Sequence, residues 1–223
     1  LVFLRELTGG IYFGEKGRQD GGETAFDNCA YTRAEVQRLA NKGFDLAMTR
    51  TKKLCCVDKA NVMATSRLWR ETVQAMEKDY PEVTVSYEFV DAVAMRLVQW
   101  PNSYDVLITE NLFGDILTDE ASVISGSMGL MPSASVGEHT SLYEPIHGSY
   151  PQATGLNIAN PLATVLSAAM MFEDAFGLTE EAAAIRAVVN KSLEEGYVTE
   201  DLAAKGAPTY GTKEVGDWLV ANL

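Results

Sequence analysis

The sequence has few basic residues for its length, and this shortage excludes several kinds of partner. It contains 18 Lys and Arg against 31 Asp and Glu, a formal net charge of -13, and no basic run offsets the excess. Such a charge balance argues against a nucleic-acid groove and against an anionic membrane surface. No apolar run approaches the roughly 18 residues that a membrane span needs. We therefore expect neither nucleic acid nor membrane among the partners.

Cysteine is also scarce, and the opening residues are not expected to be a signal peptide. The three cysteines are Cys29, Cys55 and Cys56. The last two are adjacent in a predicted strand, where neighbouring side chains point to opposite faces. This pattern is not that of a disulfide framework or a zinc site, so a reducing cytoplasm is the expected location. Because the chain opens at Leu1 in an apolar run fit for a strand, we expect it to be a piece of a longer protein.

The spacing of apolar residues predicts strands and helices in alternation over the middle of the chain. A capping box at Thr32–Glu35 opens the first predicted helix, and Pro81 and Pro101 end two later ones. Strands are predicted at 53–57, 83–90 and 104–109, and helices at 32–51, 66–80, 92–100 and from 112 onward. This alternation is typical of an α/β fold with a sheet flanked by helices.

The segments on either side of this middle region are less regular. The N-terminal segment predicts a strand at 1–7, a Gly9-Gly10 turn, a second short strand at 11–13, a polar loop at 15–23 and a returning strand at 25–31. An isolated hairpin is marginal in water, so we expect the arm at about 9–31 to pair with another subunit.

The C-terminal part of the chain changes in texture after Gly126. Gly, Ser and Pro crowd residues 125–161, and three further helices are predicted at 160–176, 180–195 and 212–223. We therefore expect two domains, residues 1–126 and 127–223.

Two carboxylates in the motif that begins at Asn111 are the first candidate for chemistry. Asp115 and Asp119 are four residues apart on a predicted helix, so they lie on one face, a turn apart. Two carboxylates so placed repel each other unless a cation lies between them, and oxygen ligands suit Mg²⁺ or Mn²⁺. A solvated acidic face is the alternative explanation.

Charged residues follow three predicted strands in turn. Lys59, Asp91 and Asp115 each come after a strand, and ligands of open α/β sheets bind at the carboxyl ends of strands. A surface lysine is the alternative for Lys59. Arg5 and Tyr12 flank the Gly9-Gly10 turn and can be a carboxylate-binding group and a phenolic acid, or ordinary strand residues; their spacing does not decide.

The loop from Glu144 to Pro151 holds His147, one of only two histidines, beside Gly148. Glycine lets backbone amides approach a ligand closely, although a structural turn is the simpler explanation. The loop is not a GxGxxG fingerprint, so a Rossmann-type dinucleotide fold is not supported.

Taken together, these motifs resemble the β-decarboxylating dehydrogenases, the isocitrate/isopropylmalate dehydrogenase family. The resemblance runs the length of the chain, and Asp58 before Lys59 is typical of the isopropylmalate branch. The motifs that carry it are Arg5–Gly14, Val57–Val62, Asn111–Glu120, Gly126–Ala134 and Glu144–Ser149.

The resemblance implies an NAD-dependent oxidation of a 2-hydroxy dicarboxylic acid, expected to be 3-isopropylmalate, followed by loss of its β-carboxylate. It implies Lys59 as general base, Tyr12 as general acid and Arg5 and Asp91 as substrate-binding residues. The implied ligands of Mg or Mn are Asp91, Asp115 and Asp119. The implied cofactor-binding residues are Asn61, Glu144, His147, Gly148, Ser149, Gln152 and Asn160. In the family, Lys59 and Asp91 serve the site of the other subunit, so a homodimer with shared active sites is expected.

Two departures from the family pattern matter. The family's N-terminal third, with residues that select the substrate, has no counterpart in these 223 residues, which alone are therefore expected to be inactive. Gln152 replaces an Asp that binds the adenosine ribose, so NADP is less strongly excluded than usual. Isocitrate, tartrate and homoisocitrate remain alternative substrates, and a non-catalytic dimerising piece is the alternative of another class.

Overall fold

The computed structural model describes residues 1–223, which divide into two compact units, Leu1–Ala121 and Ser122–Leu223. The division lies a few residues before the boundary expected at 126. No helix is both long and apolar enough to cross a membrane.

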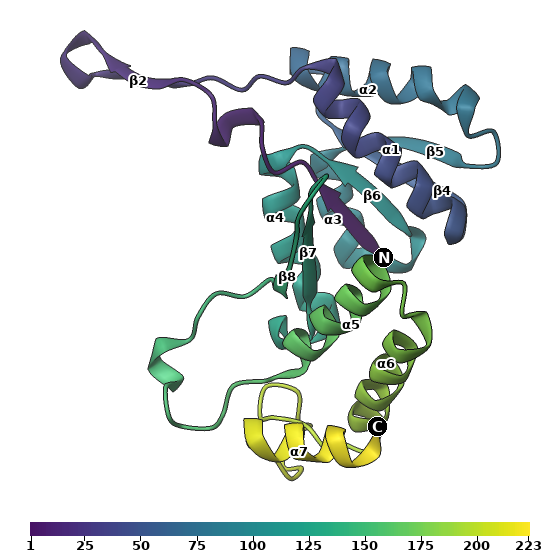
Figure 1. The fold of residues 1–223 in the computed structure, drawn as a ribbon. Helices are drawn as coiled ribbons and strands as arrows, with labels where there is room; N and C mark the ends of the chain where they lie inside the picture. The colour runs from purple at the N-terminus through teal and green to yellow at the C-terminus, as the bar shows by residue number, and fades with distance from the viewer. The chain divides into compact units, whose positions relative to one another are not determined.

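A four-stranded parallel sheet forms the centre of the first unit, in the order β1-β6-β4-β5 (Figure 1). The sheet flanked by helices confirms the predicted α/β fold. Its strands are β1 Val2–Arg5, β4 Lys53–Asp58, β5 Thr84–Phe89 and β6 Val106–Thr109. Its helices are α1 Arg33–Thr49, α2 Ala64–Met76, α3 Val90–Gln99 and α4 Asn111–Ser122.

The alternation of side chains along β4 builds two cores, one on each face of this sheet. Leu54 and Cys56 pack with α1 and α2, and Cys55 and Val57 pack with α3 and α4. The two adjacent cysteines therefore point to opposite faces, as predicted, and all three cysteines are free. Local signals hold as well: Thr32 caps α1 through a complete capping box with Glu35.

The arm differs in detail from the prediction. The strand predicted at 11–13 is wrong: Gly10–Tyr12 forms a 3₁₀-helix, because Gly10 has φ +74° and its carbonyl accepts the amides of Phe13 and Gly14. The hairpin is instead β2 Lys16–Gln19 with β3 Thr24–Asp27, so the predicted loop at 15–23 contains a strand. Its turn at Asp20–Gly22 has positive φ throughout, and Figure 1 shows the hairpin extending away from the sheet.

The second unit contains the three predicted long helices. It also contains one hairpin, which was not predicted from the sequence. The hairpin pairs β7 Pro132–Val136 with β8 Ser141–Pro145, and both strands contact α5. The helices are α5 Leu162–Phe176, α6 Thr179–Glu194 and α7 Thr212–Asn222, close to the predicted ranges. Their core includes Leu162, Val188, Val189, Val215 and Leu219.

Candidate active site

The predicted site residues of the first unit gather at one edge of its sheet. All four strands are parallel, so their carboxyl ends meet at that edge. Arg5 is the last residue of β1, and Lys59 directly follows β4. Asp91 lies in the first turn of α3, which follows β5, and Asp115 lies in α4, which follows β6.

Arg5 is held on three sides. Its Nη1 pairs with an Asp115 carboxylate oxygen at 2.8 Å, and its Nε donates to Asn111 Oδ1 at 2.9 Å. Its guanidinium carbon lies 5.5 Å from the centre of the Tyr12 ring. The close approach to α4 needs a glycine at 114, because a Cβ there would come within 2.7 Å of the Arg5 Cγ atom. The missing side chain at Gly114 therefore leaves the space against α4 that the Arg5 side chain occupies.

Tyr12 ends the 3₁₀-helix η1 and keeps 40% of its surface exposed. Desolvation, followed by the hydrogen bond and the charge of Asp115, raises the pKa of the phenol above its ordinary value, and Arg5 opposes the shift. The phenol therefore stays protonated at neutral pH, which is the state that a proton donor requires.

Hydrogen bonds and ion pairs hold Lys59 and the residues on either side of it in place. Its Nζ pairs with Asp91 at 2.5 Å, and its backbone amide donates to Ser66 Oγ at 2.9 Å. The hydrogen bond and charge of Lys59 help to lower the pKa of Asp91. Directly before it, the buried Asp58 accepts both Nε and Nη2 of Arg70, at 2.7 and 3.0 Å, and the Ala60 amide at 2.9 Å. The family-typical Asp58 therefore anchors the loop that carries Lys59.

The donor set of the predicted metal site suits a hard cation. Asp115 and Asp119 lie one turn apart on α4, with Asp115 partly buried and Asp119 exposed, and carboxylate oxygens are the ligands that Mg²⁺ and Mn²⁺ prefer. Within one chain, however, no three His, Cys, Asp or Glu side chains group closely enough to hold a metal. Because the resemblance gives Asp91 to the other subunit's site, the three-ligand metal site stays a prediction.

Most of the predicted cofactor-binding residues belong to the second unit, and Asn61 to the first. Glu144 is the second-to-last residue of β8, and His147, Gly148 and Ser149 follow in an irregular loop. Gln152 is exposed in the short 3₁₀-helix Pro151–Ala153.

Asn160 is already engaged within its own unit. Its Oδ1 accepts the Leu162 amide at 2.9 Å at the start of α5, and its Nδ2 donates to Asp201 at 3.0 Å. The Asn160 side chain therefore already has partners within its own unit, and its part in binding a cofactor stays a prediction.

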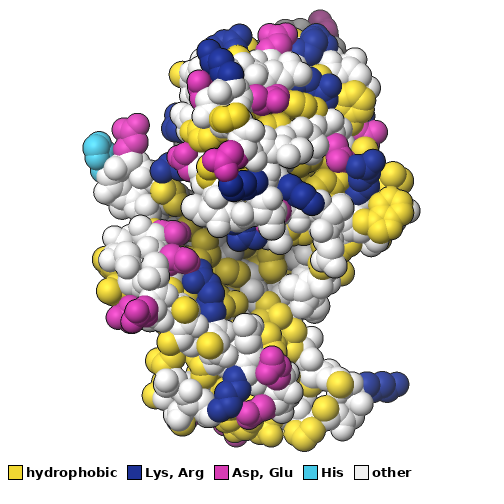
Figure 2. All heavy atoms as spheres, turned by 90° about the vertical axis from the view of Figure 1, so that its right-hand side faces the viewer, with side chains coloured by type: hydrophobic (Ala, Val, Ile, Leu, Met, Phe, Trp, Pro, Cys, Tyr) yellow, Lys and Arg dark blue, Asp and Glu magenta, His cyan; other side chains and the backbone are white.

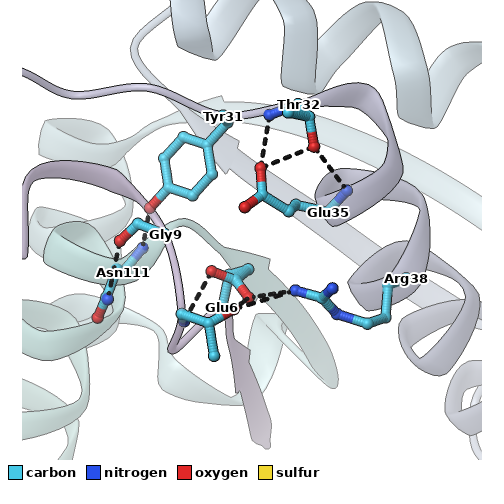
Figure 3. A network of polar contacts seen from close by, with 8 residues as sticks. Glu6, Gly9, Tyr31, Thr32, Glu35, Arg38 and Asn111 are labelled. Carbon is cyan, nitrogen blue, oxygen red and sulfur yellow. Dashed lines mark hydrogen bonds and ion pairs between the residues drawn. The ribbon is translucent and has the colours of Figure 1, made fainter. Parts of the chain in front are cut away.

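Three buried polar residues behind Arg5 were not predicted from the sequence. Tyr31, Glu110 and Asn111 are 8%, 5% and 2% exposed. The Tyr31 hydroxyl donates to Glu110 at 2.9 Å. It also accepts the Asn111 backbone amide at 3.0 Å (Figure 3). The one available signal was polar residues directly after a buried strand, at 110–111.

The surface character of the chain agrees with its composition. On the face shown in Figure 2, Lys and Arg side chains stand among Asp and Glu side chains, without a continuous basic patch. This distribution gives no support to a nucleic-acid surface there.

One edge of this parallel sheet therefore presents Arg5, Lys59 and the aspartates Asp91 and Asp115, with Tyr12 beside Arg5. The family model for isocitrate/isopropylmalate dehydrogenase matches residues 1–219, and the chain belongs to this family. Curated relatives carry the name 3-isopropylmalate dehydrogenase. The one from Bacteroides fragilis is 57% identical over 97% of this chain, and the one from Desulfitobacterium hafniense 52% over 100%.

Solved structures of the family have the same fold. An isocitrate dehydrogenase from Methylococcus capsulatus matches the whole chain with a TM-score of 0.93 and 36% identity, over 66% of its own length. A β-decarboxylating dehydrogenase from Thermococcus kodakarensis matches 94% of this chain, and 60% of its own, with a TM-score of 0.83 and 33% identity. The chain spans 61% and 63% of the two curated relatives named above.

Proposed function

We propose that the complete gene product catalyses the NAD-dependent oxidative decarboxylation of 3-isopropylmalate to 2-oxoisocaproate, a step of leucine biosynthesis. The observation that carries this proposal is the 52–57% identity to relatives of that name, against 36% to the isocitrate dehydrogenase structure. Asp58, beside Lys59, supports the same branch. The three free cysteines support a reducing, cytoplasmic location.

Each side chain at the sheet edge has a distinct part in this reaction. Lys59 takes the proton from the substrate's 2-hydroxyl group as the hydride leaves the carbon. Arg5 binds a substrate carboxylate through the guanidinium protons that Asn111 and Asp115 leave free. After the β-carboxylate departs as CO₂, Tyr12 gives its proton to the carbon that carried it.

Two bound groups complete the chemistry. Asp91, Asp115 and Asp119 would hold a divalent Mg or Mn ion, which would supply positive charge to the substrate, and NAD⁺ would supply the hydride acceptor. The carboxylate donor set on α4 supports the metal, and the loop from Glu144 to Gln152 supports the cofactor.

The substrate is tested by steady-state rates on four acids. We expect kcat/KM to be highest for 3-isopropylmalate, ahead of isocitrate, tartrate and homoisocitrate, in the complete gene product with NAD⁺ and Mg²⁺. A preference for isocitrate would instead assign the protein to the isocitrate dehydrogenases. No turnover on any of the four would favour a non-catalytic dimerising protein.

We further propose a homodimer with shared sites. Apolar side chains are exposed on neighbouring helices of the first unit: Met95 and Val98 on α3 and Ile116 on α4 are 54%, 73% and 56% exposed. The projecting β2–β3 hairpin adds unpaired strand edges, which a second copy can cover.

Mixed dimers test the sharing of residues. Lys59→Met and Asp115→Asn dimers should each be inactive, but a heterodimer of the two retains one site with both native residues if Lys59 serves its partner's site. After subunit exchange, we expect about a quarter of the wild-type activity, from one site in half of the dimers. No recovery, with exchange verified by mass spectrometry, would show that each subunit builds its own site.

A further inference from the structure

Asn111 uses both ends of its side chain at the head of α4. Its Oδ1 accepts the Nε–H of Arg5 at 2.9 Å, and its Nδ2 donates to the Gly9 carbonyl at 3.1 Å. Its backbone amide donates to the Tyr31 hydroxyl at 3.0 Å, as Figure 3 shows together with the Gly9 bond. At 2% exposure, Asn111 is shielded from bulk water, which strengthens its hydrogen bonds.

The two groups that Asn111 joins lead to two different parts of the site. On one side, its bond to Nε sets the plane of the Arg5 guanidinium, whose Nη1 then meets Asp115. On the other side, its bond to Gly9 holds the turn from which η1, ending in Tyr12, begins.

The two side-chain hydrogen bonds of Asn111, to Arg5 and to Gly9, are called the Asn111 bracket below. The Gly9-Gly10 turn has the shape that its bond to Gly9 requires. A Cβ at Gly9 would come within 2.8 Å of the Tyr31 ring, and one at Gly10 within 2.1 Å of the Tyr31 hydroxyl oxygen. Gly10 also has φ +74°, which disfavours any side chain. The turn can therefore lie flat on Tyr31 and place the Gly9 carbonyl at Asn111.

We propose that Asn111 is a positioning residue that fixes the substrate-binding Arg5 and the Tyr12-bearing turn in one geometry. The proposal rests on the proposed function for the roles of Arg5 and Tyr12. Arg5 has a long, flexible side chain, and a misplacement of about 1 Å at a reacting centre costs on the order of a hundredfold in rate. A single amide that orients both groups therefore acts on substrate binding and on proton transfer.

Two substitutions at the position separate its two bonds. Asn111→Ala removes both, whereas Asn111→Asp keeps the acceptor for Arg5 and loses the donor to Gly9. In the complete gene product, we expect Asn111→Ala to raise KM for the hydroxy acid and lower kcat, each by roughly tenfold or more. Asn111→Asp should restore KM toward the wild-type value but not kcat. KM for NAD⁺ should stay within about twofold in both.

A nuclear magnetic resonance measurement tests the bracket without turnover. The Nε–H signal of Arg5, identified by its loss in Arg5→Lys, should exchange slowly with water in the wild type and at least about tenfold faster in Asn111→Ala. Asn111→Asp should keep the slow exchange. Asn102→Ala, at an exposed amide of the same unit, is the matched control and should change neither exchange nor kinetics.

The outcomes separate this proposal from the proposed function. Unchanged Arg5 exchange in Asn111→Ala, or a lowered melting temperature with unaltered KM and kcat, would overturn the positioning role. If Asn111→Ala does not fold, Asn111→Asp decides: restored KM together with wild-type kcat would contradict the role at Gly9. An inactive wild type with a slowly exchanging Arg5 would refute the proposed function and leave the bracket intact.

Discussion

The buried ion pair beneath Lys59 gives the sharpest stability prediction. The Asp58 side chain is fully buried and accepts two hydrogen bonds from Arg70, while the guanidinium lies over the rings of Tyr87 and Phe89. Arg70→Met leaves a buried carboxylate with the Ala60 amide as its remaining partner. Breaking a buried pair in this way costs about 3–5 kcal/mol, and we expect the lower end because that amide bond is kept.

The measurement is urea unfolding followed by fluorescence. Trp69 is 1% exposed on α2, next to Arg70, and therefore reports on this part of the first unit. Arg70→Met should lower the free energy of unfolding by about 3 kcal/mol. Adding Asp58→Asn should recover part of the loss, because a neutral amide needs no cation.

A matched control distinguishes this pair from an exposed one. Arg96 pairs with Glu88 in the same unit, but its side chain is 46% exposed, so Arg96→Met should cost less than about 1 kcal/mol. Equal and small costs for Arg70→Met and Arg96→Met would refute the idea that Asp58 anchors the loop of Lys59.

Two further predictions concern acid stability and cofactor choice. Desolvation raises the pKa of Asp105, but hydrogen bonds from Thr51 and Arg50 outweigh it and lower the pKa from 3.8 to about 2. This depressed pKa contributes stability above pH 3.8 that is lost as the pH falls toward 2. In urea titrations over that window, Asp105→Asn should therefore lose roughly 2 kcal/mol less than the wild type. For the cofactor, Gln152→Asp should lower kcat/KM with NADP relative to NAD, through repulsion of the 2′-phosphate; an unchanged ratio would mean that residue 152 does not face the ribose.

The parts of the fold that the sequence predicted correctly depend on local signals. The capping box at Thr32 and Glu35 defines the start of α1 within four residues. The apolar run of β4 predicts a strand whose side chains are buried on both faces of the sheet, and this does not depend on which strands pair with it. The arm strand β2 could not be found in this way. Its residues Lys16–Gln19 are polar, and pairing with β3 rather than apolar alternation makes them a strand.

The charged residues of the candidate site could be predicted from the sequence, but the buried polar residues that hold them in place could not. Arg5, Lys59 and Asp115 stand after apolar runs, which marks the carboxyl edge of a parallel sheet. Asn111 gave no comparable signal, because both of its side-chain partners lie more than 100 residues away in the sequence. A buried amide is recognised only once the fold brings those partners together.

The first-turnover yield of NADH tests the assigned chemistry most directly. With 3-isopropylmalate, NAD⁺ and Mg²⁺ in the complete gene product, Lys59→Met should form almost no NADH, because the hydroxyl proton has no acceptor. Tyr12→Phe should form close to one NADH per site in the first turnover and then slow down, because its missing proton is needed only after hydride transfer. A Tyr12→Phe enzyme that forms no NADH, or a Lys59→Met enzyme with a wild-type burst, would contradict this account.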